Sequence, residues 1–404
     1  MTKVYDNATD IITFARLQAQ NTTSGSSYLG SDGLLKFAAE DEPRIEYAAD
    51  GSLKGLLIEE QRTNLVPHSE DFSQWTQVLN VDLDTDGTIA PDGSLATRVT
   101  DNSTNWKHRC FQANVSAVPN HTFSVFLKAG TLQYVQLLVF DSVISQNYFA
   151  NFDVINQTVT REQAPSGGTI TTDVTPVGNG WARYSIATSS ADAANIQILC
   201  LNSATVGGSP SYSGSGDTLY IYGAQLEQGS FATSYIPTSG SQSTRSPDIA
   251  SIPVSAFGYN QDAGTVVVEF DMLSDNAGTV HLTQAAFGFH DGTSNNRLEL
   301  WSASAGTLTL RDRVAPTNYD ATSTGNSLEQ STKSAASYAS GEASKLVVNG
   351  GTASVAGTAT TPPAYSTLLL GDTQNVDAEL NGHIKSLQYY PRRLTDAQLQ
   401  ELTS

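Results

Sequence analysis

Apolar and polar side chains alternate along much of the chain, and turn-forming residues separate the alternating stretches. Every second residue is apolar in residues 123–127 and 135–139, and the pattern returns in residues 266–270, 298–300 and 308–310. A period of two places successive side chains on opposite faces, which indicates strands with one buried face. Asp-Gly, Gly-Gly and Gly-Asn-Gly sequences lie between the strands. Strands divided by such turns are typical of sandwiches and jelly rolls, so we predict an all-β protein.

The distribution of these stretches predicts several parts in the 404 residues. Residues 1–66 contain few long apolar runs, and we interpret them as a β-rich N-terminal adaptor or anchor segment. Residues 67–238 and residues 248–404 are each long enough to bury a core, and we predict two β-sandwich or jelly-roll domains there. The small polar residues 239–247, SGSQSTRSP, are the expected linker between the two domains.

One short helix is expected at the C-terminal end. Thr395 and Gln398 have the spacing of a capping box, in which each side chain satisfies a backbone N–H of the other residue. Leu399 and Leu402 then provide an apolar side for packing. The sequence therefore predicts a closing helix after the last strand.

Charge and composition exclude some classes of partner. Lys and Arg number 21 against 40 Asp and Glu, which gives a net charge of −19. Nucleic-acid binding is disfavoured because phosphate contacts need clustered Lys and Arg. No run approaches the roughly 18 apolar residues of a membrane-spanning helix, so no membrane insertion is expected. No signal peptide is expected at the N-terminus, and a disulfide between Cys110 and Cys200 is left open.

Two sequences bracket the middle of the chain and resemble those of a known group of proteins. Residues 55–65 read GLLIEEQRTNL, and residues 225–238 read QLEQGSFATSYIPT. They resemble boundary sequences of structural and receptor-binding modules of tailed bacteriophages. The intervening SEDFSQW (69–75) and NGWARYSI (179–186) resemble the carbohydrate-binding-like jelly roll of that group. Residues 382–402, GHIKSLQYYPRRLTDAQLQEL, are similar to the end of concanavalin A-like, laminin-G-type sandwiches.

The resemblance implies a virion structural protein, a tail or head fibre or a decoration protein that attaches the particle to host-surface glycans. It also implies a homotrimer, with residues 1–66 contacting other phage virion proteins. The expected location is the virion, assembled in the host cytoplasm and released by lysis. Two alternatives stay open: a purely structural capsid or baseplate component without a ligand, and a glycan-degrading depolymerase.

Aromatic side chains are the candidate sugar-binding groups, because flat rings pack against the apolar faces of pyranoses. Trp106 lies in a polar, loop-like stretch and is the first candidate. Trp301 alternates with Leu298 and Leu300 and is expected to face outward, and Tyr148 and Tyr134 are further candidates. Trp75 and Trp181 are interpreted as core residues instead.

Catalytic motifs are missing from the sequence, and we predict a protein that is not an enzyme. Adjacent Glu59 and Glu60 would point to opposite faces of a regular strand, so they do not form the carboxylate pair of a glycosidase. No zinc-binding histidine pattern occurs. Asp82, Asp84 and Asp86 give a DxDxDG pattern that could wrap a calcium ion, although the twelfth loop position holds no Glu. Calcium is therefore the one candidate cofactor.

Overall fold

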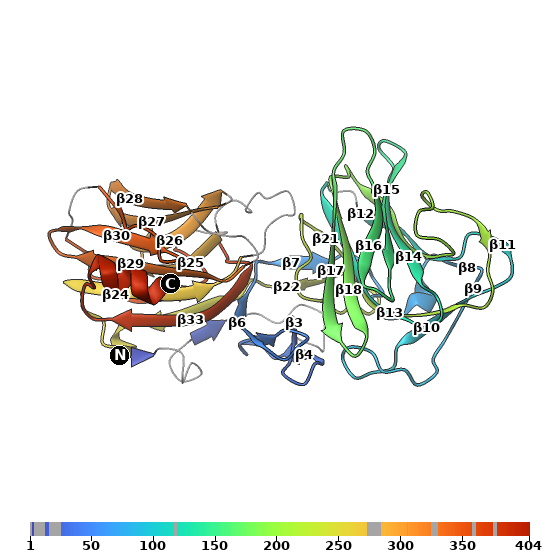
Figure 1. Cartoon of the computed structure of the whole chain (residues 1–404), viewed down its shortest axis with the longest axis horizontal. Coiled ribbons are helices and arrows are strands. Elements are labelled where there is room, and N and C mark those ends of the chain that lie inside the picture. Colours follow the sequence, from blue (N-terminus) through green and yellow to red (C-terminus); the bar gives the residue numbers. More distant parts are fainter. Residues whose placement is uncertain are drawn as a thin grey trace.

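The computed structural model describes residues 2–3, 13–15, 26–116, 119–272, 284–304, 306–324, 330–357, 361–374 and 378–404. Two β-sandwiches lie side by side, the central one in green and cyan and the C-terminal one in orange and red (Figure 1). Strands of the N-terminal segment lie in and beneath the region between them. The prediction of an all-β fold with a short C-terminal helix is confirmed for the described residues.

The central sandwich consists of two six-stranded antiparallel sheets. In spatial order the first sheet contains β17 (Ile170–Gly178), β18 (Trp181–Thr188), β13 (His121–Ala129), β21 (Thr218–Gln228), β10 (Thr97–Asp101) and β9 (Val81–Asp84). The second contains β16 (Thr158–Gln163), β15 (Gln146–Asp153), β14 (Tyr134–Asp141), β19 (Ala193–Leu201), β12 (Arg109–Ser116) and β8 (Gln77–Leu79). Phe123, Val125 and Leu127 of β13 are fully buried between the sheets, which confirms the predicted alternation.

The C-terminal sandwich also has two sheets. One contains β31 (Ser354–Val355), β30 (Glu342–Val348), β29 (Thr332–Ala339), β24 (Ala263–Phe270), β33 (Gly382–Tyr390), β6 (Leu53–Ile58) and β5 (Ile45–Tyr47), with β1 (Thr2–Lys3) also paired to β33. The other contains β2 (Thr13–Ala15), β23 (Ile249–Pro253), β32 (Thr367–Leu370), β25 (Gln284–His290), β26 (Asn296–Ser304), β27 (Thr307–Val314) and β28 (Thr317–Thr324). Leu298, Leu300, Leu308 and Leu310 point into the core between them.

The N-terminal segment is built into both sandwiches. Its strands β5 and β6 extend the sheet of β33, whereas the hairpin of β3 (Ser26–Leu29) and β4 (Leu35–Ala38) packs against Trp181 and Tyr235 of the central sandwich. Strand β7 (Arg62–Asn64) pairs with β22 (Ser243–Arg245), which lies within the stretch interpreted as a linker. Residues 1, 4–12 and 16–25 of this segment lie outside the described residues.

Short elements complete the fold. They are the one-turn helices η1 (Phe72–Gln74) and η2 (Val254–Ala256), the ribbon of β11 (Asn105–Trp106) and β20 (Tyr212–Ser213), and helix α2 (Asp396–Thr403). The predicted capping box is present: the backbone N–H of Gln398 donates to Thr395, and that of Thr395 donates to Oε1 of Gln398 at 3.0 Å. Leu399 is fully buried against the sheet of β29.

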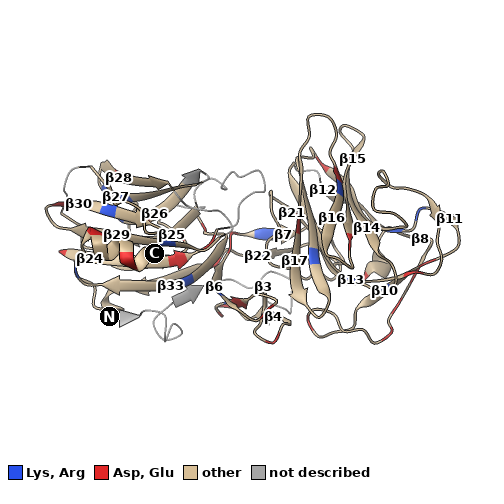
Figure 2. Cartoon of the chain, viewed as in Figure 1, with Lys and Arg blue, Asp and Glu red and all other residues tan. Residues whose placement is uncertain are grey.

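Charged residues make up only 15% of the sequence. Figure 2 shows Lys, Arg, Asp and Glu as scattered short segments on both sandwiches, with most of the ribbon free of charge. Among the described residues, no helix has the length and hydrophobicity needed to span a bilayer.

Candidate functional site

Trp106 lies on the surface of the central sandwich and exposes 53% of its area. It belongs to the ribbon in which β11 pairs with β20, and it is directly opposite Tyr212. The Nζ atom of Lys107 is 6.0 Å from the centroid of the Trp106 ring. A large aromatic ring is thus offered to solvent beside a cationic group.

Buried polar groups fix the ribbon that carries Trp106. The ring of His108 is fully buried, its Nδ1 lies 2.8 Å from the carbonyl oxygen of Asn80, and its Nε2 lies 3.1 Å from that of Tyr212. The Asn80 amide donates to the carbonyl of Lys107 at 2.8 Å. Asp101, which is also buried, accepts hydrogen bonds from the Tyr212 hydroxyl and from three successive backbone N–H groups after Gly214. The Trp106 ring therefore stands on a backbone that is held in place, which suits a rigid binding surface.

The other aromatic candidates are not brought together with Trp106. Trp301 lies in the C-terminal sandwich, partly buried, with the guanidinium carbon of Arg311 4.8 Å from its ring centroid. Tyr134 is half-buried and packs against the cluster of Leu138 and Phe149. The expectation for Tyr148 is wrong: its inward position on β15 leaves it only 3% exposed within the core, where its ring cannot meet a ligand.

The predicted calcium loop is not assembled. Arg98 occupies the place of a cation: its Nε and Nη2 donate to Asp84 at 2.7 and 2.6 Å, and its Nη1 donates to Asp86 at 3.2 Å. Hydrogen bonds from Tyr220 and Thr88 lower the pKa of Asp86 to about 2. Asp82 lies on β9, the same strand as Asp84, and is exposed. The described residues contain no group of three or more His, Cys, Asp or Glu that could hold a metal ion.

Cys110 and Cys200 are free, buried thiols. Burial raises the pKa of the Cys110 thiol to about 12, so this group behaves as a small apolar side chain and not as a nucleophile. The two cysteines therefore add no reactive group to the candidate site.

The two sequences that bracket the middle region contribute Glu59 and Ser234 to a buried ionic cluster at the junction of the sandwiches. Glu59 accepts from Arg44 at 2.7 Å and from the backbone N–H of Ser234 at 2.7 Å, and Arg245 lies 2.9 Å away. Burial alone would raise the pKa of Glu59, but the charges of Arg245 and Arg44 hold it well below its ordinary value. Arg44 also pairs with Asp248. These residues join parts of the chain that are far apart in sequence.

Glu60 belongs to a different set of contacts. It lies 2.5 Å from Nη2 of Arg62 and accepts a hydrogen bond from the Asn381 amide at 3.2 Å. Because Glu59 is committed to two arginines and Glu60 faces Arg62 and Asn381, the pair is arranged as a structural junction and not as a catalytic acid and base.

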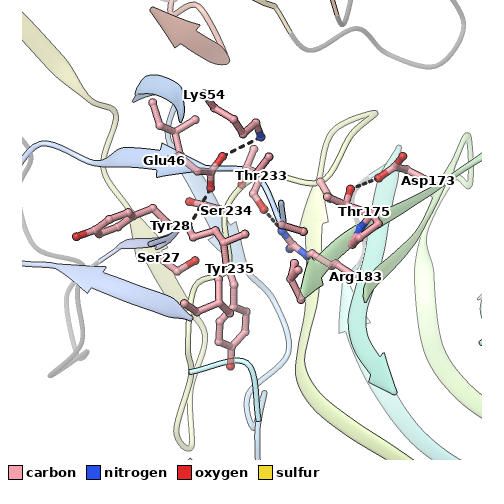
Figure 3. A pocket seen from close by; sticks show the side chains of 18 of the residues that line it. Ser27, Tyr28, Glu46, Lys54, Asp173, Thr175, Arg183, Thr233, Ser234 and Tyr235 are labelled. Carbon is pink, nitrogen blue, oxygen red and sulfur yellow. Dashed lines mark hydrogen bonds and ion pairs between the residues drawn. The ribbon is translucent and has the colours of Figure 1, made fainter. Parts of the chain in front are cut away.

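A cavity of about 630 Å³ lies beside this junction, and sequence reasoning did not find it. The N-terminal segment contributes Tyr28, Glu46 and Lys54, and the central sandwich contributes Arg183 from β18 and Phe231. Figure 3 shows Lys54 and Glu46 on one side of the space and the β17–β18 residues on the other. The one signal in the sequence was Arg183, at an outward position of the alternating stretch WARYSI. By itself, such an arginine indicates only a charge that faces solvent.

No protein-family profile and no curated protein matches the chain. Among solved structures, the carbohydrate-binding module CBM40 of Ruminococcus gnavus IT-sialidase, bound to α2,3-sialyllactose, is 20% identical with a TM-score of 0.30. That match covers 36% of this chain and 84% of the module.

Two further solved structures match at similar scores. Domains LG4-5 of the mouse laminin α1 chain are 10% identical with a TM-score of 0.26, over 80% of this chain and 96% of theirs. A pentraxin from Limulus polyphemus is 18% identical with a TM-score of 0.26, over 37% of this chain and 74% of its own. These scores are low, so the function must be inferred from the residues of the chain itself.

Proposed function

We propose that the protein is a virion component of a tailed bacteriophage that attaches the particle to glycans on the host surface. The observation that carries the binding role is the exposure of the Trp106 ring on a ribbon fixed by His108 and Asp101. A ring carried by a backbone that is already fixed leaves less to be ordered when a sugar packs against it. The phage setting rests on the resemblance of residues 55–65 and 225–238 to boundary sequences of phage modules.

Binding without catalysis is part of the proposal. A glycosidase needs two available carboxylates across the scissile bond. In the junction, Glu59 is held by two arginines, and Glu46 accepts from Lys54 at 3.0 Å and lies 2.8 Å from Nε2 of His383. These pairings favour a lectin-like role over a depolymerase. A single shallow site binds weakly, so we also propose that the protein acts as a homotrimer in which several copies of the site add avidity.

The test compares the binding of the parent and of Trp106→Ala to an array of bacterial surface polysaccharides. Truncation of an aromatic side chain at the centre of a binding surface costs about 2 kcal/mol or more, which is roughly a thirtyfold loss of affinity. The matched control is Val143→Ser, because Val143 is 69% exposed in a loop of the same sandwich. This control is expected to bind as the parent does.

Three outcomes decide the proposal. Selective loss of binding in Trp106→Ala supports it. Equal binding by Trp106→Ala and the parent contradicts the assignment of the site. A parent protein that binds no bacterial polysaccharide, but is found covered within a virion shell or baseplate, favours the purely structural alternative.

A further inference from the structure

The junction cavity forms where the outer face of the β17–β18 pair is covered by other parts of the chain. Ala182 and Tyr184 point into the core of the central sandwich, so Arg183 and Ser185 of the same strand point to the opposite side. Both of these outward residues line the cavity, together with the N-terminal segment and residues 230–235. Its volume of about 630 Å³ lies within the roughly 300–1,000 Å³ that is typical of small-molecule sites.

Two carboxylates of the cavity wall already have cationic partners. Glu46 accepts a hydrogen bond from Lys54 at 3.0 Å, and its Oε2 atom is 2.8 Å from Nε2 of His383. Glu59 is held between Arg44 and Arg245. These two acidic groups are therefore neutralised within the protein and leave little demand for a cation from outside.

Arg183 is the cationic group without such a partner. Its Nη1 donates to the backbone carbonyl of Thr233, and its Nη2 donates to the hydroxyl of Ser124 at 2.8 Å. Within the described part of the chain no ion pair of Arg183 is seen, although the charges of the buried Glu227 and Glu59 act on it, and its buried Nε has no hydrogen-bond partner. The planar guanidinium group matches a carboxylate with two parallel hydrogen bonds, and such charged hydrogen bonds are stronger than neutral ones.

Rings and hydroxyl groups complete the wall. The guanidinium carbon of Arg183 is 5.4 Å from the ring centroid of Phe126, and Tyr47 and Phe231 also line the space. Ser185 and Ser27 bring hydroxyl groups to the same surface. Aromatic surface with a few placed polar groups is the usual lining of a site for a small, partly apolar and hydroxylated molecule.

We propose that the junction cavity binds an acidic sugar, a saccharide that carries a carboxylate. The carboxylate pairs with Arg183, and the sugar ring lies against the aromatic side chains and the serine hydroxyls. Asp173 on β17 and Asp50 are exposed residues of the cavity lining, and their charges oppose an anionic ligand. This site is separate from Trp106 and does not depend on it.

Isothermal titration of the full chain with D-glucuronate, D-glucose and acetate tests the proposal. Glucuronate is expected to bind at least about tenfold more tightly than either of the other two, because only glucuronate has both the charge and the ring. Arg183→Gln is expected to weaken glucuronate binding about tenfold or more and to leave glucose binding unchanged. Absence of glucuronate binding by the parent, acetate binding as tight as that of glucuronate, or unchanged glucuronate affinity in Arg183→Gln would each overturn the proposal.

Two further variants keep the test decisive if Arg183→Gln does not fold. Asp173→Asn changes an exposed residue and is expected to strengthen glucuronate binding severalfold by removing a like charge; weaker binding would contradict the proposed orientation of the ligand. Ser185→Phe is expected to fill the cavity and abolish binding. Val143→Ser serves again as the unaffected control. Binding of soluble glucuronate tests the Arg183 site, and the polysaccharide array tests the Trp106 site. Either assignment can therefore be contradicted while the other is still supported.

Discussion

Glu59→Gln tests whether the ionic cluster holds the junction together. The substitution keeps the shape of the side chain but removes the negative charge between Arg44 and Arg245, whose side chains are 0% and 1% exposed. Removal of one partner from a buried ion pair costs about 3–5 kcal/mol, because the other charge stays buried. Arg44 keeps Asp248 as a partner, so we expect the lower end of this range, about 3 kcal/mol.

The assay is equilibrium unfolding in urea followed by tryptophan fluorescence, which reports mainly on the central sandwich because Trp75, Trp106 and Trp181 lie there. At the slopes usual for proteins, a loss of about 3 kcal/mol lowers the urea midpoint by about 1 M or more. The matched control is Glu342→Gln, an exposed carboxylate near Arg393, which is expected to stay within about 0.5 kcal/mol of the parent. If Glu59→Gln is as stable as this control, the assignment of the cluster as a structural junction is refuted.

Two further predictions concern pH and metal ions. Burial alone would raise the pKa of Glu46, but the contacts with His383 and Lys54 outweigh burial and lower this pKa from 4.5 to about 2 in the folded protein. The ionised form of Glu46 therefore contributes about 3 kcal/mol to the free energy of unfolding. This contribution is fully present above about pH 4.5 and is lost as the pH falls toward 2. The urea midpoint of the parent should therefore exceed that of Glu46→Gln at neutral pH and approach it in acid; a constant difference between pH 5 and pH 2 would contradict the assigned pairing. Because Arg98 already neutralises Asp84 and Asp86, added calcium is expected to leave the Tm unchanged in differential scanning calorimetry, and a Tm that rises and saturates with calcium would show a binding site instead.

Residues 55–65 and residues 225–238 are far apart in sequence and meet at the junction. Glu59 accepts hydrogen bonds from the backbone N–H and the hydroxyl of Ser234, and the amide of Asn64 donates to the carbonyl of Ile236 at 2.8 Å. The two sequences thus contact each other directly where the chain leaves one sandwich and enters the other. Glu59 and Asn64 are buried, and these hydrogen bonds satisfy polar atoms of both side chains.

The sequence by itself determined the local features of this protein. Alternation in residues 123–127 and 298–300 was sufficient to identify strands, because the period of two is a property of the extended backbone. The spacing of Thr395 and Gln398 was sufficient to place the helix start, because both hydrogen bonds of a capping box lie within four residues. The same alternation predicted an outward Trp301, whose ring is partly buried beside Arg311.

Tertiary structure alone decided what each outward or polar residue meets. Arg98 lies on β10 opposite Asp84 of β9, and this register turns a calcium-like pattern into an ion pair. Tyr148 is in the core, whereas Trp106 is exposed, although both stand beside polar residues in the sequence. Lys54 and Arg183 line the same cavity. They meet there because β5 and β6 join the sheet of β33 and the β3–β4 hairpin packs on the central sandwich. The cavity depends on packing between segments more than one hundred residues apart, and no local period records which segments meet.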